Sequence, residues 1–137
     1  MQDKRVALVT GANQGVGLQV ARELVAKGLT VLVGSRNFER GEAAAREIGA
    51  GAIAFQLDVT DRVSIADAAE RVRKEFGDLD LLVQNAAISN TRKGSLSLQE
   101  YAKITRPSNV SLDEVRAVWE TNVFGVLAVH QAMLPLP

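Results

Sequence analysis

A run of glycines near the start of the chain has the residue types and spacing that could bind phosphate groups. The run is Thr10-Gly11-Ala12-Asn13-Gln14-Gly15-Val16-Gly17, and it follows a stretch of apolar residues. A glycine-rich turn between a buried strand and a helix lets backbone N–H groups approach an anion, and the helix N-terminus adds the positive end of its dipole. The pattern predicts a nucleotide site, although glycines alone would also make a tight strand-to-helix turn.

Arg36 is the residue that indicates which nucleotide would bind. It follows a second apolar stretch and Ser35, and no carboxylate occurs near it before Glu39. In dinucleotide folds an acidic residue at this position binds the ribose 2′-hydroxyl of NAD, whereas an arginine pairs with the 2′-phosphate of NADP. We therefore expect NADP(H) to be preferred over NAD(H). The alternative is that Arg36 is a solvated surface side chain.

Strand and helix patterns alternate along the chain and would position these residues. We expect strands over residues 5–10, 30–34, 52–57 and 79–84, and helices over 15–27, 38–48, 61–76 and 112–133. Asn37 and Thr60 are the expected N-caps of the second and third helices, and Ser111 with Glu114 is the expected capping box of the last. The alternation predicts an α/β fold with a Rossmann-type doubly wound parallel sheet, here a βαβαβαβα portion. The polar residues 88–110 are expected to form a long loop.

Composition limits the classes of protein to consider. The 137 residues fit one dinucleotide-binding domain over residues 1–137, and 47% apolar against 23% charged residues favours a packed core. Sixteen basic and 16 acidic residues cancel, so there is no electrostatic case for nucleic acid or an anionic membrane. The chain has no cysteine and one histidine, which argues against disulfides and a metal site. No apolar run reaches transmembrane length, and we expect a soluble, cytoplasmic protein.

Four motifs in order resemble those of the short-chain dehydrogenase/reductase family. They are the turn of residues 10–17, the pair Asp58-Val59, the segment Gln84-Asn85-Ala86-Ala87, and Asn122 within Thr121-Asn122-Val123-Phe124-Gly125. The resemblance covers the whole chain but only roughly the first half of a typical member. Gln84 and Ala87 depart from the asparagine and glycine that the family usually has at these positions.

The resemblance implies a set of cofactor contacts. They are Thr10, Gly11, Asn13, Gln14, Gly15, Val16, Gly17, Ser35, Arg36, Asn37, Asp58, Val59, Asn85, Ala86 and Ala87. In the family the aspartate accepts a hydrogen bond from the adenine amino group, and Asn85 and Ala86 would flank the ribose. An alternative role for Asp58 is to stabilise the N-terminus of the helix that follows.

Asn122 is the one candidate catalytic residue in the chain. Its helical spacing places it on or near an apolar stripe, so its amide is expected to be buried and to need hydrogen-bond partners. The resemblance implies that it holds a water molecule connecting a catalytic lysine to solvent. The alternative is an amide that only binds a helix carbonyl.

The activity that the resemblance implies is reversible, NADP(H)-dependent hydride transfer between a carbonyl and an alcohol. The family's chemistry needs a serine, a tyrosine and a lysine. Tyr101 does not start the Tyr-x-x-x-Lys motif, because Thr105 stands where the lysine is required. We therefore expect these residues to be the N-terminal part of a longer reductase, truncated before the catalytic segment. A non-catalytic NADP(H)-binding fragment or redox-sensing module would need the same residues.

Two segments suggest partners. Residues 123–129 are apolar on nearly all sides of the last expected helix, which predicts a homo-oligomer formed through that helix. Residues 88–110 would either reach over the cleft that binds a small carbonyl or alcohol substrate and set specificity, or form a surface insert.

Overall fold

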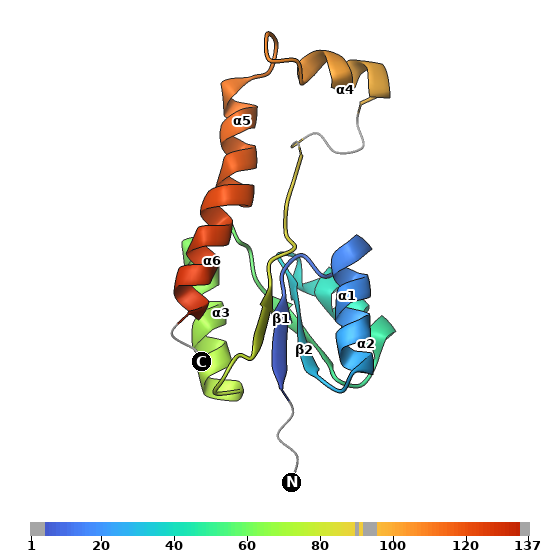
Figure 1. The fold of residues 1–137 in the computed structure, drawn as a ribbon, viewed down its shortest axis with the longest axis vertical. Coiled ribbons are helices and arrows are strands. Elements are labelled where there is room, and N and C mark those ends of the chain that lie inside the picture. Colours follow the sequence, from blue (N-terminus) through green and yellow to red (C-terminus); the bar gives the residue numbers. More distant parts are fainter. Residues whose placement is uncertain (1–4, 90, 92–95, 135–137) are drawn as a thin grey trace.

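The computed structural model describes residues 5–89, 91 and 96–134 and contains one sheet with helices on both faces (Figure 1). The elements, in chain order, are β1 (Val6–Val9), α1 (Gly15–Ala26), β2 (Thr30–Ser35), α2 (Phe38–Ile48), β3 (Ala52–Gln56), α3 (Arg62–Glu75), β4 (Leu81–Val83), α4 (Leu98–Ile104), α5 (Leu112–Trp119), the π-helix η1 (Glu120–Gly125) and α6 (Val126–Met133). The predicted order of strands and helices over the sheet is confirmed.

The sheet is parallel throughout and has the order β3-β2-β1-β4. Leu8 in β1 pairs with Leu32 in β2 on one side and with Leu82 in β4 on the other. All four residues of β1 are buried, as expected for a central strand of a sheet covered on both faces. Within the described residues β4 is an edge strand, and its Leu81 is 38% exposed.

Alternate residues of each strand enter different halves of the core. Leu8, Leu32 and Phe55 pack in a cluster with α3 and α6, whereas Val9 and Val33 pack in a second cluster with α1 and α2. This period of two follows from the pleat of the strands. Figure 1 shows the result, with α1 and α2 on one face of the sheet and α3 and α6 on the other.

The third helix begins one residue later than predicted. Its N-cap is Asp61, whose Oδ1 accepts hydrogen bonds from the N–H groups of Val63 and Ser64. Thr60 instead donates both its N–H and its hydroxyl to Oδ1 of Asp58. The prediction of Thr60 as the N-cap was therefore wrong. Thr60 and Asp61 are both residue types that cap helices, and Thr60 is engaged by the carboxylate of Asp58, so Asp61 caps the helix.

The expected long loop at 88–110 contains a helix. α4 has a complete capping box, in which Ser97 accepts from the Glu100 N–H and the Glu100 carboxylate accepts from the Ser97 N–H. The capping box predicted for the last helix is only half formed. Ser111 accepts from the Glu114 N–H, but the Glu114 carboxylate accepts from the N–H and hydroxyl of Thr91.

The predicted last helix is continuous in space but changes its winding. Its residues form α5, then the π-helix η1, then α6, and the three segments stack into one long helix, whose α6 end lies beside α3 and whose α5 end extends beyond the sheet (Figure 1). Asn122 lies inside η1. Among the described residues, no helix combines the length and apolar character that crossing a membrane requires.

Candidate functional site

A cleft of about 330 Å³ opens at the carboxyl ends of β1, β3 and β4, where parallel α/β sheets bind ligands. Its lining contains most of the residues predicted to contact a cofactor. Those that line it are Gly11, Asn13, Gln14, Gly15, Arg36, Asp58, Val59, Asn85, Ala86 and Ala87. The cleft thus brings together residues from three separate motifs of the sequence.

The glycine-rich turn is shaped by close contacts with the chain that follows β4. Gly11 has a φ of 60°, and a Cβ added to it would lie 2.9 Å from Cα of Ala86. A Cβ on Gly17 would lie 2.4 Å from Nδ2 of Asn85. No side chain caps α1 at Gln14, and no acidic residue occupies its first turn. The N-terminus of α1, which borders the cleft at Gly15, therefore has no carboxylate in its own first turn to offset the positive end of the helix dipole.

Thr10 joins this turn to the end of β4. Its side chain is buried, and Oγ1 accepts hydrogen bonds from the N–H groups of Asn85 at 2.9 Å and Ala86 at 3.0 Å. Nδ2 of Asn85 in turn donates to the carbonyl of Gly11 at 3.0 Å. Thr10 and Asn85 thus form a brace that fixes two walls of the cleft relative to each other.

Arg36 is an exposed cation at the rim of the cleft. Its guanidinium makes no ion pair or hydrogen bond with the part of the chain that the structure describes, while its carbonyl accepts from Nε2 of Gln56 at 2.6 Å. The buried hydroxyl of Ser35 donates to the carbonyl of Asn37 and accepts from its N–H. Oδ1 of Asn37 caps α2 by accepting a hydrogen bond from the backbone N–H of Arg40. Ser35 and Asn37 therefore shape the turn that carries Arg36, and neither lines the cleft.

Asp58 faces the cleft in a fixed orientation. Its Oδ1 accepts from the N–H of Thr60 at 2.9 Å and from the Thr60 hydroxyl at 2.7 Å, and its own N–H donates to Oγ of Ser64 at 2.8 Å. The carboxylate is thereby fixed beside the start of α3, as the alternative role for Asp58 proposed, and it also lines the cleft. Both roles are compatible with the geometry.

Asn122 contacts the strand side of the cleft through Ile88. Nδ2 of Asn122 donates to the carbonyl of Ile88 at 2.7 Å, and Oδ1 accepts from the Ile88 N–H at 2.9 Å. The amide is half-buried and not fully buried as expected, and its partner is a backbone outside the helix, not a helix carbonyl. Ile88 and Thr121 line the cleft, so Asn122 connects its two sides.

Val16, Thr10 and Gly17 were predicted contacts that do not line the cleft. Val16 is 74% exposed on the first turn of α1, and the other two are buried supports of the turn. The sequence interpretation missed four residues of the lining, which are Leu57, Thr60, Ile88 and Thr121. Leu57 and Thr60 could have been found, because they follow the third predicted strand, whose carboxyl end lies at the ligand side of the sheet.

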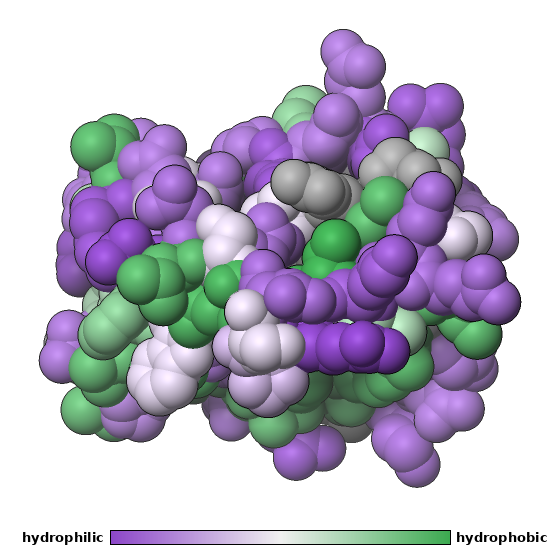
Figure 2. All heavy atoms as spheres, turned by 90° about the horizontal axis from the view of Figure 1, so that it is seen from above, coloured by the Kyte–Doolittle hydropathy of each residue, from purple (hydrophilic) through white to green (hydrophobic). Residues whose placement is uncertain are grey.

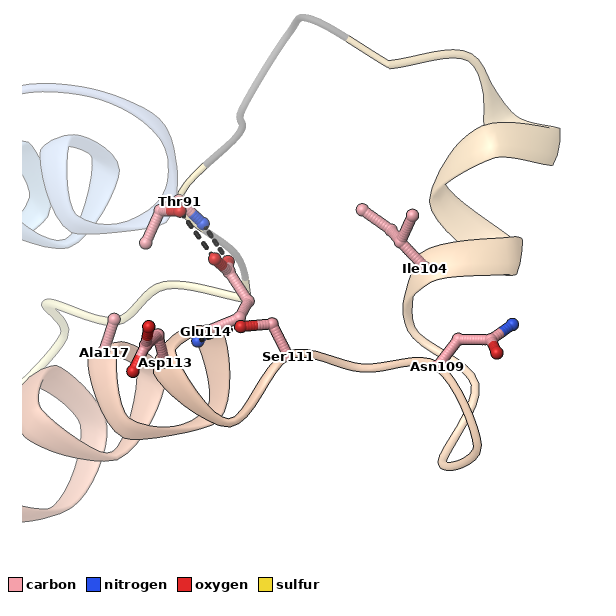
Figure 3. A pocket seen from close by; sticks show the side chains of 7 residues that line it. All are labelled: Thr91, Ile104, Asn109, Ser111, Asp113, Glu114 and Ala117. Carbon is pink, nitrogen blue, oxygen red and sulfur yellow. Dashed lines mark hydrogen bonds between the residues drawn. The ribbon is translucent and has the colours of Figure 1, made fainter.

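A second hollow of about 390 Å³ lies farther along α5 (Figure 3). Ile104 and Asn109 come from α4 and the chain after it, whereas Ser111, Glu114 and Ala117 come from α5 and its start. The bonds between Glu114 and Thr91 close one side of it. Thr91, Ile104 and Asn109 of the segment 88–110 are thus part of a concave surface next to the helix that carries Asn122, whereas residues 90 and 92–95 of that segment lie outside the described residues.

The long helix leaves apolar side chains uncovered. The exposed ones are Leu112, Trp119, Val123, Phe124, Leu127 and Leu134, at 42–67% exposure. Figure 2 looks onto the end of the molecule where α4 lies and shows a mainly hydrophilic surface with separate hydrophobic patches.

Among the described residues no three histidine, cysteine, aspartate or glutamate side chains are grouped to hold a metal ion.

The similarity to known proteins agrees with this geometry. Residues 5–136 match the sequence profile of the family described as short chain dehydrogenase. The chain belongs to the short-chain dehydrogenase/reductase family. It is 36% identical over 150 residues to short-chain dehydrogenase/reductase 1 of Saponaria officinalis, covering 99% of this chain and 49% of that protein.

Two further relatives of the chain are reductases by name. Carbonyl reductase (NADPH) 3 of Homo sapiens is 38% identical over 109 residues, which cover 77% of this chain and 39% of that protein. The solved structure of menthone neomenthol reductase from Mentha piperita superposes with a TM-score of 0.81 at 30% identity, covering 98% of this chain and 56% of that one. The chain therefore spans about half the length of the short-chain dehydrogenases/reductases that it resembles.

Proposed function

We propose that the protein is an NADP(H)-dependent oxidoreductase that interconverts a carbonyl and an alcohol by hydride transfer. The observation that carries this proposal is a cleft lined by three groups. They are the N-terminus of α1, the guanidinium of Arg36, which has no partner among the described residues, and the oriented carboxylate of Asp58. These three groups suit a pyrophosphate, a 2′-phosphate and an adenine amino group, respectively. Membership of the family supports the same conclusion.

The residues present fit a nicotinamide dinucleotide. Backbone N–H groups of the turn at residues 11–17 would hold the pyrophosphate, and Asn85 and Ala86 would flank the ribose. Gly11 and Gly17 have backbone and side-chain atoms of residues 85–86 where a Cβ would stand, so this cradle depends on the absence of side chains there. The bound cofactor would supply or accept the hydride. The human relative is named for its use of NADPH, which favours the phosphorylated cofactor here, as Arg36 does.

Asn122 is the residue of this chain that we assign to the proton relay. Its amide is fixed on both sides by Ile88, so its backbone and side chain are held at a defined distance from the cleft. A fixed polar group can hold a water molecule in one place, which a relay requires. We propose that the serine, tyrosine and lysine of the family are supplied by the remainder of the whole protein.

The segment 88–110 is the proposed determinant of substrate choice. It contributes Thr91, Ile104 and Asn109 to the second hollow, beside the helix that carries Asn122 (Figure 3). Exchanging residues 96–110 for the corresponding segment of a relative should change the order of preference among ketone substrates. An unchanged order would mean that the segment is only a surface insert.

Turnover is the direct test of the proposed reaction. The whole protein should oxidise NADPH only when an aldehyde or ketone is added, and the rate should fall strongly in Asn122→Ala. A second candidate function is that of a non-catalytic NADP(H)-binding or redox-sensing module. It is favoured by the cleft itself, because the cofactor contacts lie within these residues. NADPH binding without carbonyl-dependent oxidation would support that candidate against ours.

We further propose a cytoplasmic homo-oligomer formed through the long helix. The exposed apolar side chains of η1 and α6, Phe124 and Leu127 among them, would lose contact with water in such an assembly. Leu127→Glu should lower the mass measured by sedimentation, whereas Arg116→Glu, a charge change on the same helix outside the patch, should leave it unchanged. An unaltered mass in Leu127→Glu would contradict this interface.

A further inference from the structure

Among the described residues, three pairs bond the chain that leaves β4 to the long helix. The bonded pairs are Gln84 with Val126, Ile88 with Asn122, and Thr91 with Glu114. From pair to pair the residue number increases along the chain after β4 (84, 88, 91) and decreases along the helix (126, 122, 114), so the two segments run antiparallel. In the first pair the side chain of Gln84, directly after β4, binds the backbone of the helix. In the second pair the side chain of Asn122 in the helix binds the backbone of Ile88.

The helix changes its winding between these attachment points. Asn122 lies in η1, where the hydrogen bonds span five residues and the segment that follows is rotated relative to an α-helix. A π-helical segment is rare, so contacts outside the helix must hold it. Gly125 allows one, since a Cβ there would lie 2.7 Å from the carbonyl oxygen of Val59. Gln84 supplies a second, because its Nε2 donates to the carbonyl of Val126 at 2.9 Å, and the bonds between Asn122 and Ile88 supply a third.

The amide of Gln84 has one satisfied end and one unsatisfied end. Nε2 must face Val126, because a carbonyl oxygen accepts hydrogen bonds and cannot donate them. Oε1 is then buried and accepts no hydrogen bond from any residue that the structure describes. A buried acceptor without a partner opposes folding, so it offsets part of the stability that the bond from Nε2 to Val126 contributes. The net contribution of the Gln84 amide to stability is therefore small, and the bond to Val126 is the interaction by which this side chain can act on the helix.

We propose that Gln84 is a positioning residue for Asn122. By holding the Val126 carbonyl, Gln84 fixes the π-helical turn in the register that places the Asn122 amide on Ile88. This inference rests on the proposed function, since Asn122 is assigned there to the proton relay. Gln84 does not line the cleft and acts only through Asn122 and Ile88.

Amide hydrogen exchange measured by NMR on the full chain without cofactor tests the inference. Gln84→Met keeps the length of the side chain and removes both polar atoms. The Ile88 N–H should then exchange at least about tenfold faster, approaching its rate in Asn122→Ala, because its acceptor is no longer held in place. The N–H groups of Leu8 and Leu32 in the core should keep their rates. Gln56→Met, which loses a bond to Arg36 at the other side of the sheet, should leave Ile88 unchanged.

Two results would overturn the proposal. One is an Ile88 exchange rate in Gln84→Met equal to that of the parent protein while Asn122→Ala accelerates it. The other is an equal acceleration of Ile88, Leu8 and Leu32, which would show that Gln84 only stabilises the fold. In the whole protein, Gln84→Met should also lower kcat more than it changes KM. Because the exchange measurement uses no cofactor or substrate, absence of carbonyl reduction would contradict the proposed function and leave the exchange result valid.

Discussion

The side-chain amide of Asn122 and the backbone of Ile88 exchange two hydrogen bonds, one in each direction, of 2.7 and 2.9 Å. This pairing joins the long helix to the chain that leaves β4, and both segments border the cleft. The two bonds hold the side chain of Asn122 against the backbone of Ile88. The consequences of this pairing for stability and for the cleft can be measured separately.

Asn122→Ala should lower the free energy of unfolding by about 1–3 kcal/mol, because the half-buried N–H and carbonyl of Ile88 lose their partners. Urea denaturation followed by circular dichroism measures this change. Asn109→Ala is the matched control, since its amide makes one exposed bond to the carbonyl of Lys103, and it should change stability by less than about 0.5 kcal/mol. Equal effects of the two substitutions would contradict a specific role for the Asn122 pairing.

Thr10→Val should destabilise the protein by about 2–4 kcal/mol. Valine has nearly the same shape but leaves the N–H groups of Asn85 and Ala86 without the oxygen that both now bond. Thr10→Ser keeps that oxygen and should cost about 1 kcal/mol for the lost methyl group. Thermal unfolding of both variants decides the matter, and a serine variant as unstable as the valine variant would refute the brace.

Gly17→Ala should destabilise the protein by about 1–3 kcal/mol, since its Cβ would lie 2.4 Å from Nδ2 of Asn85 and 2.6 Å from the Gly11 carbonyl oxygen. Gly41→Ala, also in a helix, brings its Cβ no closer than 3.2 Å to a neighbour, and alanine's helix propensity offsets part of that contact. Chemical denaturation should therefore rank Gly17→Ala as the more harmful change. The reverse order would mean that the turn can move away from Asn85.

The assignment of Asp61, and not Thr60, as the N-cap of α3 can be tested by substituting each residue. Asp61→Ala should cost about 1 kcal/mol, because Oδ1 of Asp61 accepts from the N–H groups of Val63 and Ser64. Thr60→Ala should change stability by less than about 0.5 kcal/mol, since its hydroxyl binds only the exposed Oδ1 of Asp58. If Thr60→Ala proved the costlier of the two in thermal unfolding, the cap would have been placed wrongly.

The sequence was informative wherever a local pattern decides the structure. The strand, glycine turn and helix at residues 5–27 were predicted because buried strands read as continuous apolar runs and glycines mark the turn between them. The capping box at Ser97 and Glu100 was equally visible and would have predicted α4. The helix that follows this box is short and has no buried residue, so no helical spacing of apolar residues accompanies the box in the sequence.

The π-helical turn could not be predicted from local pattern. Residues 120–125 continue the helical spacing of their neighbours, and the turn depends on Gly125 meeting Val59 and on Gln84 meeting Val126. Both contacts join residues that are more than 40 positions apart. The exposure of Val123 and Phe124 is a different case, because the apolar residues on nearly all sides of 123–129 already indicated that this helix has more apolar surface than one sheet can cover.

The central claim is that the cleft binds NADP(H) through Arg36, and calorimetric titration with NADPH and NADH tests it most directly. The parent protein should bind NADPH more tightly, and Arg36→Asp should shift the ratio of the two affinities toward NADH by at least about tenfold, because a carboxylate repels the 2′-phosphate that a guanidinium would pair with. Arg40→Asp makes the same charge change on α2 and should leave the ratio unaltered. A ratio that is the same in Arg36→Asp as in the parent protein would contradict the claim.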